Sequence, residues 1–175
     1  MLPYLLRKLL EQQADALLAD YEFQAVKIGM TGSVATVEWI ARLLARLPGV
    51  PVVLDPVLAA ESGGSLAQGD LNEALMDRVA PQATVLTPNL PEAGQLSGET
   101  GVAEAGAALT RRCGRAVLVT GTHDDTDQVA NHLFQGEHHR QWEWPRLPEV
   151  YHGSGCSLAS AIASLLARGL PLEDA

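Results

Sequence analysis

Four short apolar runs alternate with segments of helical spacing, and this alternation limits the fold more than any single motif does. The apolar runs cover 24–30, 50–56, 83–89 and 115–121, and the helical segments cover about 4–20, 37–47, 71–79 and 103–112. Strands that alternate with helices form parallel sheets with helices packed on both faces. The sequence therefore predicts an α/β fold with a mostly parallel central sheet.

A polar stretch after the fourth strand predicts a β-hairpin. Its strands are expected at 129–134 and 140–144, around Gln135-Gly136-Glu137. Trp142 and Trp144 alternate along the second of these strands, so both should face the same side. A last apolar, alanine-rich helix is expected after Gly155.

The composition fits one globular domain, residues 1–175, with a sizeable core, because 47% of its residues are hydrophobic. The formal net charge of −9 argues against non-specific nucleic-acid binding. No apolar run is long enough for a membrane span, and the first residues lack the features of a signal peptide. Cys113 and Cys156 form no CxxC pair, which favours reduced thiols and a cytoplasmic location.

The four apolar runs all end in residues that can serve a binding site. They end at Gly29-Met30, Asp55-Pro56, Thr87-Pro88-Asn89 and Thr120-Gly121. Ligands of open parallel sheets bind outside the carboxyl ends of the strands, so these residues are expected to face one crevice. The simpler explanation for each is that Gly, Pro, Asp and Asn often terminate strands.

The segment Gly153-Ser154-Gly155-Cys156 places a glycine turn and a thiol at the start of the last helix. Exposed amides at a helix start attract anions, and the helix dipole is expected to give Cys156 thiolate character. This arrangement suits phosphoryl transfer. The simpler alternative for a lone cysteine is a small buried hydrophobic residue.

Thr87-Pro88-Asn89-Leu90-Pro91-Glu92-Ala93 is the second motif with chemical content. Asn89 and Glu92 lie three residues apart, so one helical turn can aim both side chains inward, where they can hold Mg²⁺ through water. A turn followed by a helix with Glu in its first turn is the structural alternative, and for this motif alone it is the favoured one.

Taken together, six segments resemble the hydroxymethylpyrimidine/phosphomethylpyrimidine kinases of thiamine biosynthesis. They are Val26–Met30, Val53–Val57, Ser62-Gly63, Thr87–Ala93, Ala116–Val119 and His152–Cys156. The resemblance implies a ribokinase-like three-layer sandwich. It also implies transfer of the γ-phosphoryl group of Mg·ATP to the pyrimidine alcohol and then to its monophosphate.

The resemblance also implies roles for individual residues. Cys156 matches the catalytic cysteine, and the amides of Gly153, Ser154 and Gly155 would surround the transferring group. Thr120 and Gly121 lie in the position of a nucleotide-binding loop.

The resemblance implies binding roles for five other residues. Asn89 and Glu92 match an element that organises Mg²⁺ and phosphate, and Asp55 is expected to bind the metal together with Glu92. Met30 and Val57 match positions that line the pyrimidine pocket.

The sequence also departs from the family pattern. Thr120 stands where a lysine is usual, Glu61 stands where another is common, and the chain is short at both ends, apparently without the family's N-terminal strand region. Either the sequence is part of a longer chain, which the intact motifs favour, or it is a short, degenerate member. The functional alternatives are a pyridoxal-type kinase and a non-catalytic homologue that binds nucleotide or pyrimidine. A homodimer is a further expectation, since members of this fold commonly pair.

Overall fold

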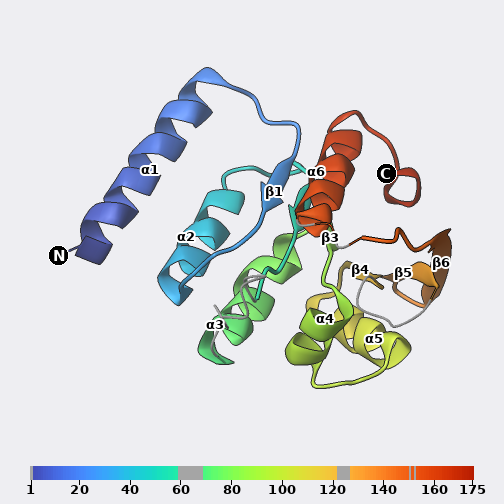
Figure 1. Cartoon of the computed structure of the whole chain (residues 1–175). Coiled ribbons are helices and arrows are strands. Elements are labelled where there is room, and N and C mark those ends of the chain that lie inside the picture. Colours follow the sequence, from blue (N-terminus) through green and yellow to red (C-terminus); the bar gives the residue numbers. More distant parts are fainter. Residues whose placement is uncertain (1, 59–68, 122–126, 150, 152) are drawn as a thin grey trace.

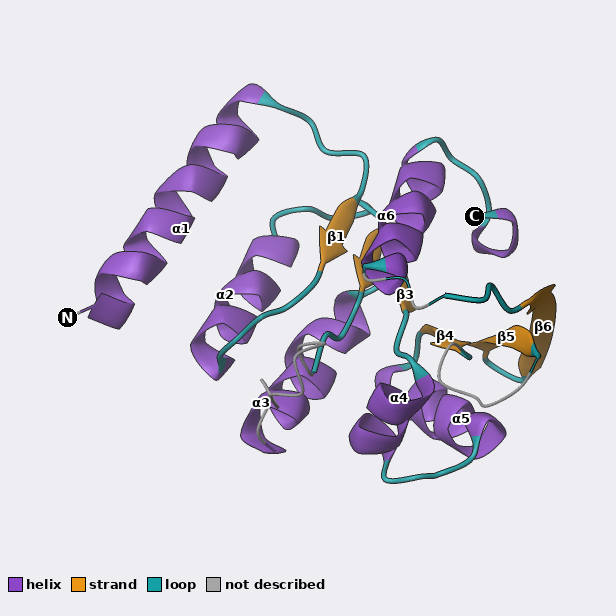
Figure 2. Ribbon diagram, viewed as in Figure 1, coloured by secondary structure: helices purple, strands orange, loops and turns teal. Residues whose placement is uncertain are grey.

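The computed structural model describes residues 2–58, 69–121, 127–149, 151 and 153–175. The chain forms one sheet with helices packed on both faces (Figures 1 and 2). Its strands are β1 (Val26–Ile28), β2 (Val52–Leu54), β3 (Val85–Leu86), β4 (Ala116–Thr120), β5 (Gln128–Gln135) and β6 (His138–Pro145). Its α-helices are α1 (Leu2–Asp20), α2 (Val34–Leu44), α3 (Gly69–Ala74), α4 (Leu90–Ser97), α5 (Val102–Cys113) and α6 (Ser154–Ala167).

The sheet order follows the chain order, β1-β2-β3-β4-β5-β6. The first four strands pair in parallel, with Val26 opposite Val52, Val53 opposite Val85, and Val85 opposite Ala116. β5 and β6 add an antiparallel hairpin on the β4 edge. The predicted α/β class, the mostly parallel sheet and the hairpin are confirmed.

Successive side chains of a strand point to opposite faces of the sheet, so the residues of the short strands pack into two separate cores. Val52, Leu54 and Leu86 point into the larger core, which lies under α2, α3, α4 and α5. Val53 and Val85 point into the smaller one, which they share with residues of α6. Helices on both faces explain why these strands are apolar throughout.

Local signals set most of the helix boundaries. Ser33 caps α2 by accepting a hydrogen bond from the Thr36 amide. The helix predicted over 71–79 is instead α3 followed by one π-helical turn, η1 (Leu75–Val79). Short 3₁₀ turns, η2 (Ala80–Gln82) and η3 (Leu172–Asp174), precede β3 and follow α6.

α1 lies beside α2 on the outside of the molecule (Figure 1). Asp15 of α1 pairs with Arg46, which follows α2, at 2.7 Å. Much of the described part of α1 faces solvent, including Leu9 and Leu17, each 50% exposed. Among the helices of the described ranges, none has the length and apolarity that crossing a bilayer requires.

Candidate active site

The carboxyl ends of the four parallel strands are aligned by backbone hydrogen bonds that continue past the strands themselves. The Asp55 amide donates to Ile28 O at 2.8 Å, the Thr87 amide to Leu54 O at 2.9 Å, and the Thr120 amide to Pro88 O at 2.9 Å. This ladder brings the predicted strand-end residues to one edge of the sheet, as the sequence pattern indicated.

Asp55 is the buried carboxylate of this edge. The residue is 5% exposed, and its Oδ2 lies 2.8 Å from the Nζ of Lys27 on β1. Lys27 lies opposite Val53 in the register, so its side chain leaves the sheet on the α6 side. A buried carboxylate is stable only with such a partner, because removing a lone charge from water is costly. Sequence analysis missed Lys27, although a lysine in an otherwise apolar strand was a visible signal.

α6 brings Cys156 to the same group of charges. The helix starts after Gly153, whose φ of 78° is in the left-handed region that favours glycine. Because Gly153 has no side chain to cap the helix, the first-turn amides of Ser154, Gly155 and Cys156 point out of the helix start. All four residues are exposed.

The thiol of Cys156 does not gain thiolate character, so this part of the sequence interpretation is wrong. Hydrogen bonding to the Asp55 carboxylate, burial and the charge of Asp55 raise its pKa above the ordinary value, while Lys27 offsets part of this shift. Both charged groups therefore act on the sulfur, and Cys156 keeps its proton at neutral pH.

Asn89 and Glu92 form a capping box at the start of α4. The Asn89 Oδ1 accepts from the Glu92 amide at 2.9 Å, and the Glu92 Oε2 accepts from the Asn89 amide at 3.0 Å. Glu92 Oε1 accepts a third hydrogen bond from the Leu58 amide at 3.3 Å. The structural alternative for this pair is confirmed, and a role in binding Mg²⁺ or phosphate stays a prediction.

Glu92 is nevertheless electrostatically coupled to the strand edge. Burial raises the pKa of this carboxyl, the hydrogen bonds from Asn89 and Leu58 lower it, and the charge of Asp55 raises it further. The charge of Asp55 thus acts on both Glu92 and Cys156.

Thr120 and Gly121 lie next to Asn89, because Asn89 and Thr120 form a parallel bridge at the end of β4. The Gly121 amide donates to Asn131 Oδ1 at 3.3 Å. A Cβ on Gly121 would lie 2.1 Å from the carbonyl oxygen of Ala130, so only glycine fits against β5 here. A contact of these two residues with nucleotide stays a prediction.

The predicted pyrimidine contacts also follow strands of this edge. Met30 comes two residues after β1 and is 58% exposed, and Val57 is half-buried three residues after β2. Their role in substrate binding remains a prediction. Glu61, Ser62-Gly63 and His152, which the sequence analysis also considered, lie outside the described residues.

The residues of the edge fit a magnesium ion. Mg²⁺ usually takes one or two carboxylates and completes its shell with water and phosphate oxygens. Asp55 and Glu92 supply the carboxylates, and the buried Thr87 Oγ1 has no hydrogen-bond partner among the described residues. Within the described residues there is no cluster of three or more His, Cys, Asp or Glu side chains that could hold a metal alone. These oxygen atoms therefore suit a Mg²⁺ ion whose remaining ligands are phosphate oxygens and water.

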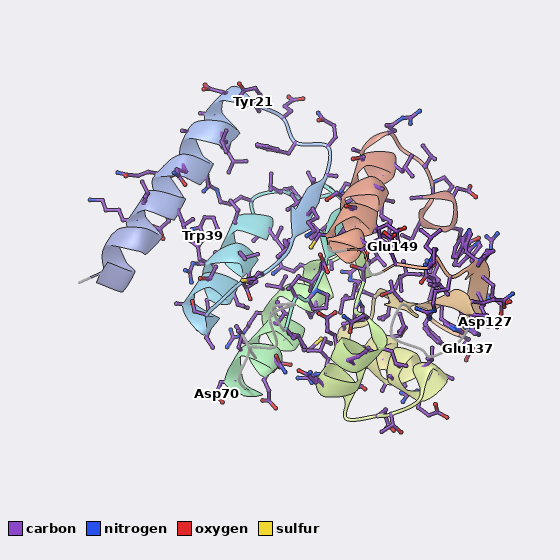
Figure 3. All side chains as sticks on the ribbon, in the orientation of Figure 1. Tyr21, Trp39, Asp70, Asp127, Glu137 and Glu149 are labelled. Carbon is purple, nitrogen blue, oxygen red and sulfur yellow. The ribbon has the colours of Figure 1, made fainter. Side chains whose placement is uncertain are left out.

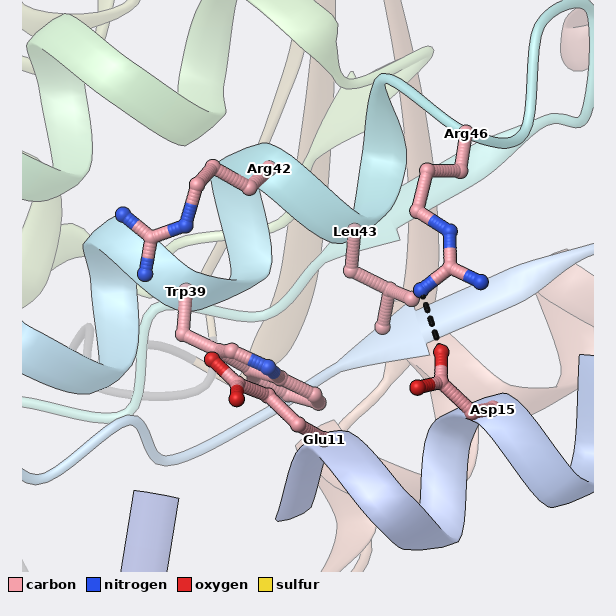
Figure 4. A pocket seen from close by; sticks show the side chains of 6 residues that line it. All are labelled: Glu11, Asp15, Trp39, Arg42, Leu43 and Arg46. Carbon is pink, nitrogen blue, oxygen red and sulfur yellow. Dashed lines mark hydrogen bonds and ion pairs between the residues drawn. The ribbon is translucent and has the colours of Figure 1, made fainter. Parts of the chain in front are cut away.

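Two hollows lie away from this edge. One, of about 190 Å³, lies between α1 and α2, where Trp39 projects toward Glu11 (Figures 3 and 4). The other, of about 260 Å³, lies between α6 and the sheet, and both Trp142 and Trp144 line it, so they face the same side as expected. Neither hollow is lined by Asp55, Glu92 or Cys156.

Comparison with known proteins agrees with this geometry. The profile of the phosphomethylpyrimidine kinase family matches residues 4–175. The chain belongs to this family. A hydroxymethylpyrimidine/phosphomethylpyrimidine kinase of Staphylococcus aureus is 34% identical over 173 residues, which cover 94% of this chain and 63% of that protein. The chain thus spans less than two thirds of that relative's length.

Solved structures confirm the ribokinase-like fold of this family member. The phosphomethylpyrimidine kinase of Clostridium difficile superposes with a TM-score of 0.79 at 29% identity, covering 96% of this chain and 71% of that one. The pyridoxal kinase of S. aureus in complex with ADP superposes with a TM-score of 0.84 at 28% identity, covering 94% and 62%. The resemblance seen in the sequence segments is confirmed.

Proposed function

We propose that this chain carries out ATP-dependent phosphorylation of 4-amino-5-hydroxymethyl-2-methylpyrimidine and of its monophosphate, in thiamine biosynthesis. The observation that carries this proposal is the position of Cys156 at the uncapped start of α6. There its thiol interacts with Asp55, which follows β2, and with Lys27 of β1. An anion-binding helix start beside a charged edge suits a reaction in which a phosphoryl group moves. The family membership supplies the substrate class.

In the proposed reaction, the hydroxyl oxygen of the pyrimidine attacks the γ-phosphorus of ATP, and ADP leaves. The first-turn amides of α6 stabilise the charge on the transferring group. The proton of the hydroxyl passes to the sulfur of Cys156. The Asp55 carboxylate, whose charge acts on that thiol, can take the proton that the sulfur gives up.

The co-substrate ATP is supported by the S. aureus pyridoxal kinase, which was solved in complex with ADP. Asp55 and Glu92 are the residues proposed to hold Mg²⁺, which when bound would neutralise charge on the phosphates. Asn89, Thr120 and Gly121 are proposed to border the nucleotide, and Met30 and Val57 the pyrimidine. The proposed location is the cytoplasm, where an exposed thiol such as that of Cys156 stays reduced.

A pyridoxal-type kinase is the second candidate. The observation in its favour is the TM-score of 0.84 with the S. aureus pyridoxal kinase. Both acceptors carry a hydroxymethyl group on an aromatic ring, so the same thiol and amides could serve either.

The test is to incubate the purified protein with Mg·ATP and either the hydroxymethylpyrimidine or pyridoxal, and to follow ADP release and the phosphorylated product. We expect the pyrimidine to be phosphorylated, and its monophosphate to react further. Turnover of pyridoxal alone would support the second candidate. Binding of ATP by calorimetry, with neither acceptor phosphorylated, would identify a non-catalytic homologue and contradict the proposal.

A further inference from the structure

The positive charges of this chain are distributed unevenly around the proposed site. The chain has 12 Lys and Arg residues, and only Lys8 and Lys27 are lysines. Lys8 is exposed on α1. The segments outside the described ranges at 59–68 and 122–126, which follow β2 and β4, contain neither Lys nor Arg.

None of the arginines directly follows one of the parallel strands β1 to β4, although Arg146 lies at the same edge of the sheet, after β6. Six of them lie within helices or in β6: Arg7, Arg42, Arg78, Arg111, Arg112 and Arg140. The other four follow α2, α5, β6 and α6, respectively: Arg46, Arg115, Arg146 and Arg168. Lys27 is therefore the one cationic side chain that this edge of the sheet has between β1 and β4, among the residues described.

Gly29 lies close to the ammonium group of Lys27. The side chain extends along the chain direction, so a Cβ on Gly29 would lie 2.9 Å from Nζ. The Nζ lies 2.8 Å from Asp55 Oδ2, yet the Lys27 side chain is still 23% exposed, whereas that of Asp55 is 8% exposed. The ammonium group thus neutralises a buried carboxylate, while part of the lysine side chain remains exposed.

The Lys27 side chain leaves the sheet on the face that α6 covers. The thiol of Cys156 interacts with Lys27 as well as with Asp55. Cys156 belongs to the first turn of α6, whose outward amides are the proposed anion site. A phosphoryl group held by those amides would therefore lie within reach of a lysine side chain at this position.

We propose that Lys27 is the phosphate-binding cation of this site, with its ammonium group bound to an oxygen of the terminal phosphoryl group of ATP beside the α6 amides. This role rests on the proposed kinase function. A lysine serves as a point charge in such sites.

The test is the affinity for two nucleotides, measured by calorimetry with Mg²⁺ present. AMP-PCP carries a terminal third phosphate and does not transfer it, whereas ADP lacks that phosphate. We expect Lys27→Met to weaken AMP-PCP binding about tenfold or more, with a much smaller effect on ADP, because a charge-assisted hydrogen bond is lost. Lys27→Arg should keep most of the affinity, and Lys8→Met, the matched control, should leave both affinities unchanged.

The competing role for Lys27 is neutralisation of Asp55 alone. The double variant Lys27→Met/Asp55→Asn separates the two roles, and it also removes the unpaired buried charge that could unfold the single variant. The reference for the double variant is Asp55→Asn alone, because both lack the Asp55 carboxylate that is proposed to hold Mg²⁺. Under the proposal, the double variant binds AMP-PCP about tenfold or more weakly than Asp55→Asn does, with a much smaller difference for ADP. Equal affinities of these two variants for both nucleotides would overturn the proposal while the kinase function stands. A wild-type protein that binds neither nucleotide would overturn the kinase function, and the role of Lys27 with it.

Discussion

Asn89 and Glu92 hold each other at the start of α4, since the side chain of each accepts a hydrogen bond from the backbone amide of the other. The second Glu92 oxygen accepts from the Leu58 amide, in the segment that follows β2. Glu92 therefore ties the turn after β3 to the segment after Asp55. This tie fixes the spacing of two strand ends that border the proposed site.

The capping box should matter for stability. Glu92→Ala removes one half of the box and leaves the buried Leu58 amide and the partly buried Asn89 amide without their partner, so we expect a loss of about 2 kcal/mol or more in the free energy of unfolding. Glu92→Gln should cost less, because its amide oxygen can accept one of these hydrogen bonds. Urea unfolding measures both, with the exposed Glu38→Ala of α2 as the control. A Glu92→Ala variant as stable as this control would contradict the structure.

Glu92 should also give the stability a pH dependence. Because burial raises the pKa of Glu92 above its ordinary value of 4.5, the folded state holds a proton that the unfolded state releases. The free energy of unfolding should therefore fall as the pH rises from 4.5 through the raised pKa, and Glu92→Gln should remove this component. A wild-type slope equal to that of the Gln variant over this window would refute the assignment.

The pKa of Cys156 makes a separate prediction about its reactivity. Since Asp55 raises the pKa of the thiol, alkylation by iodoacetamide should be slow at neutral pH and should accelerate only at a pH above that of an ordinary thiol. Asp55→Asn should shift the rate profile to lower pH. Cys113 is buried and should react far more slowly, so the label is found on Cys156 by mass spectrometry. A profile that Asp55→Asn leaves in place would show that the carboxylate does not act on the thiol.

Two glycines of the α6 turn should respond in opposite ways to substitution by alanine. Gly153 has a φ of 78°, so Gly153→Ala should cost about 1–2 kcal/mol of stability. Gly155 lies inside the helix with open space around its Cβ position, so Gly155→Ala should stabilise the protein by up to about 1 kcal/mol.

The same Gly155→Ala variant should lose turnover, because a methyl group would stand where the phosphoryl group approaches the amides. Thermal unfolding and a turnover assay on one preparation test this pair of effects. Full activity in a stabilised Gly155→Ala variant would argue against anion binding at the α6 turn.

The architecture was largely predictable because it depends on patterns that are local in the sequence. Strand alternation, the turn residues at strand ends and the Ser33 cap all act over a few residues, and each favoured the observed fold. The single π-helical turn at Leu75–Val79 was not predictable, because its apolar residues keep ordinary helical spacing.

The site was predictable only in part. The rule that ligands bind at the carboxyl ends of parallel strands correctly predicted Asp55, Asn89 and Thr120 at one edge of the sheet. It could not predict that the side chains of Asn89 and Glu92 each bind the backbone amide of the other. The pKa of Cys156 depends on Asp55, a residue 101 positions earlier (156 − 55), and only the folded structure brings these two together. The helix dipole alone therefore predicted a lowered pKa for Cys156, whereas the pKa is raised.

The most direct test of the account is the turnover number of Cys156→Ala with Mg·ATP and the hydroxymethylpyrimidine. Its matched control is Ser164→Ala, an exposed residue two turns further along α6. We predict that Cys156→Ala loses at least about 100-fold in turnover while its unfolding temperature stays that of the wild type, and that Ser164→Ala is fully active. A Cys156→Ala enzyme within about twofold of the wild-type turnover would contradict the central claim that this thiol handles the proton of the reaction.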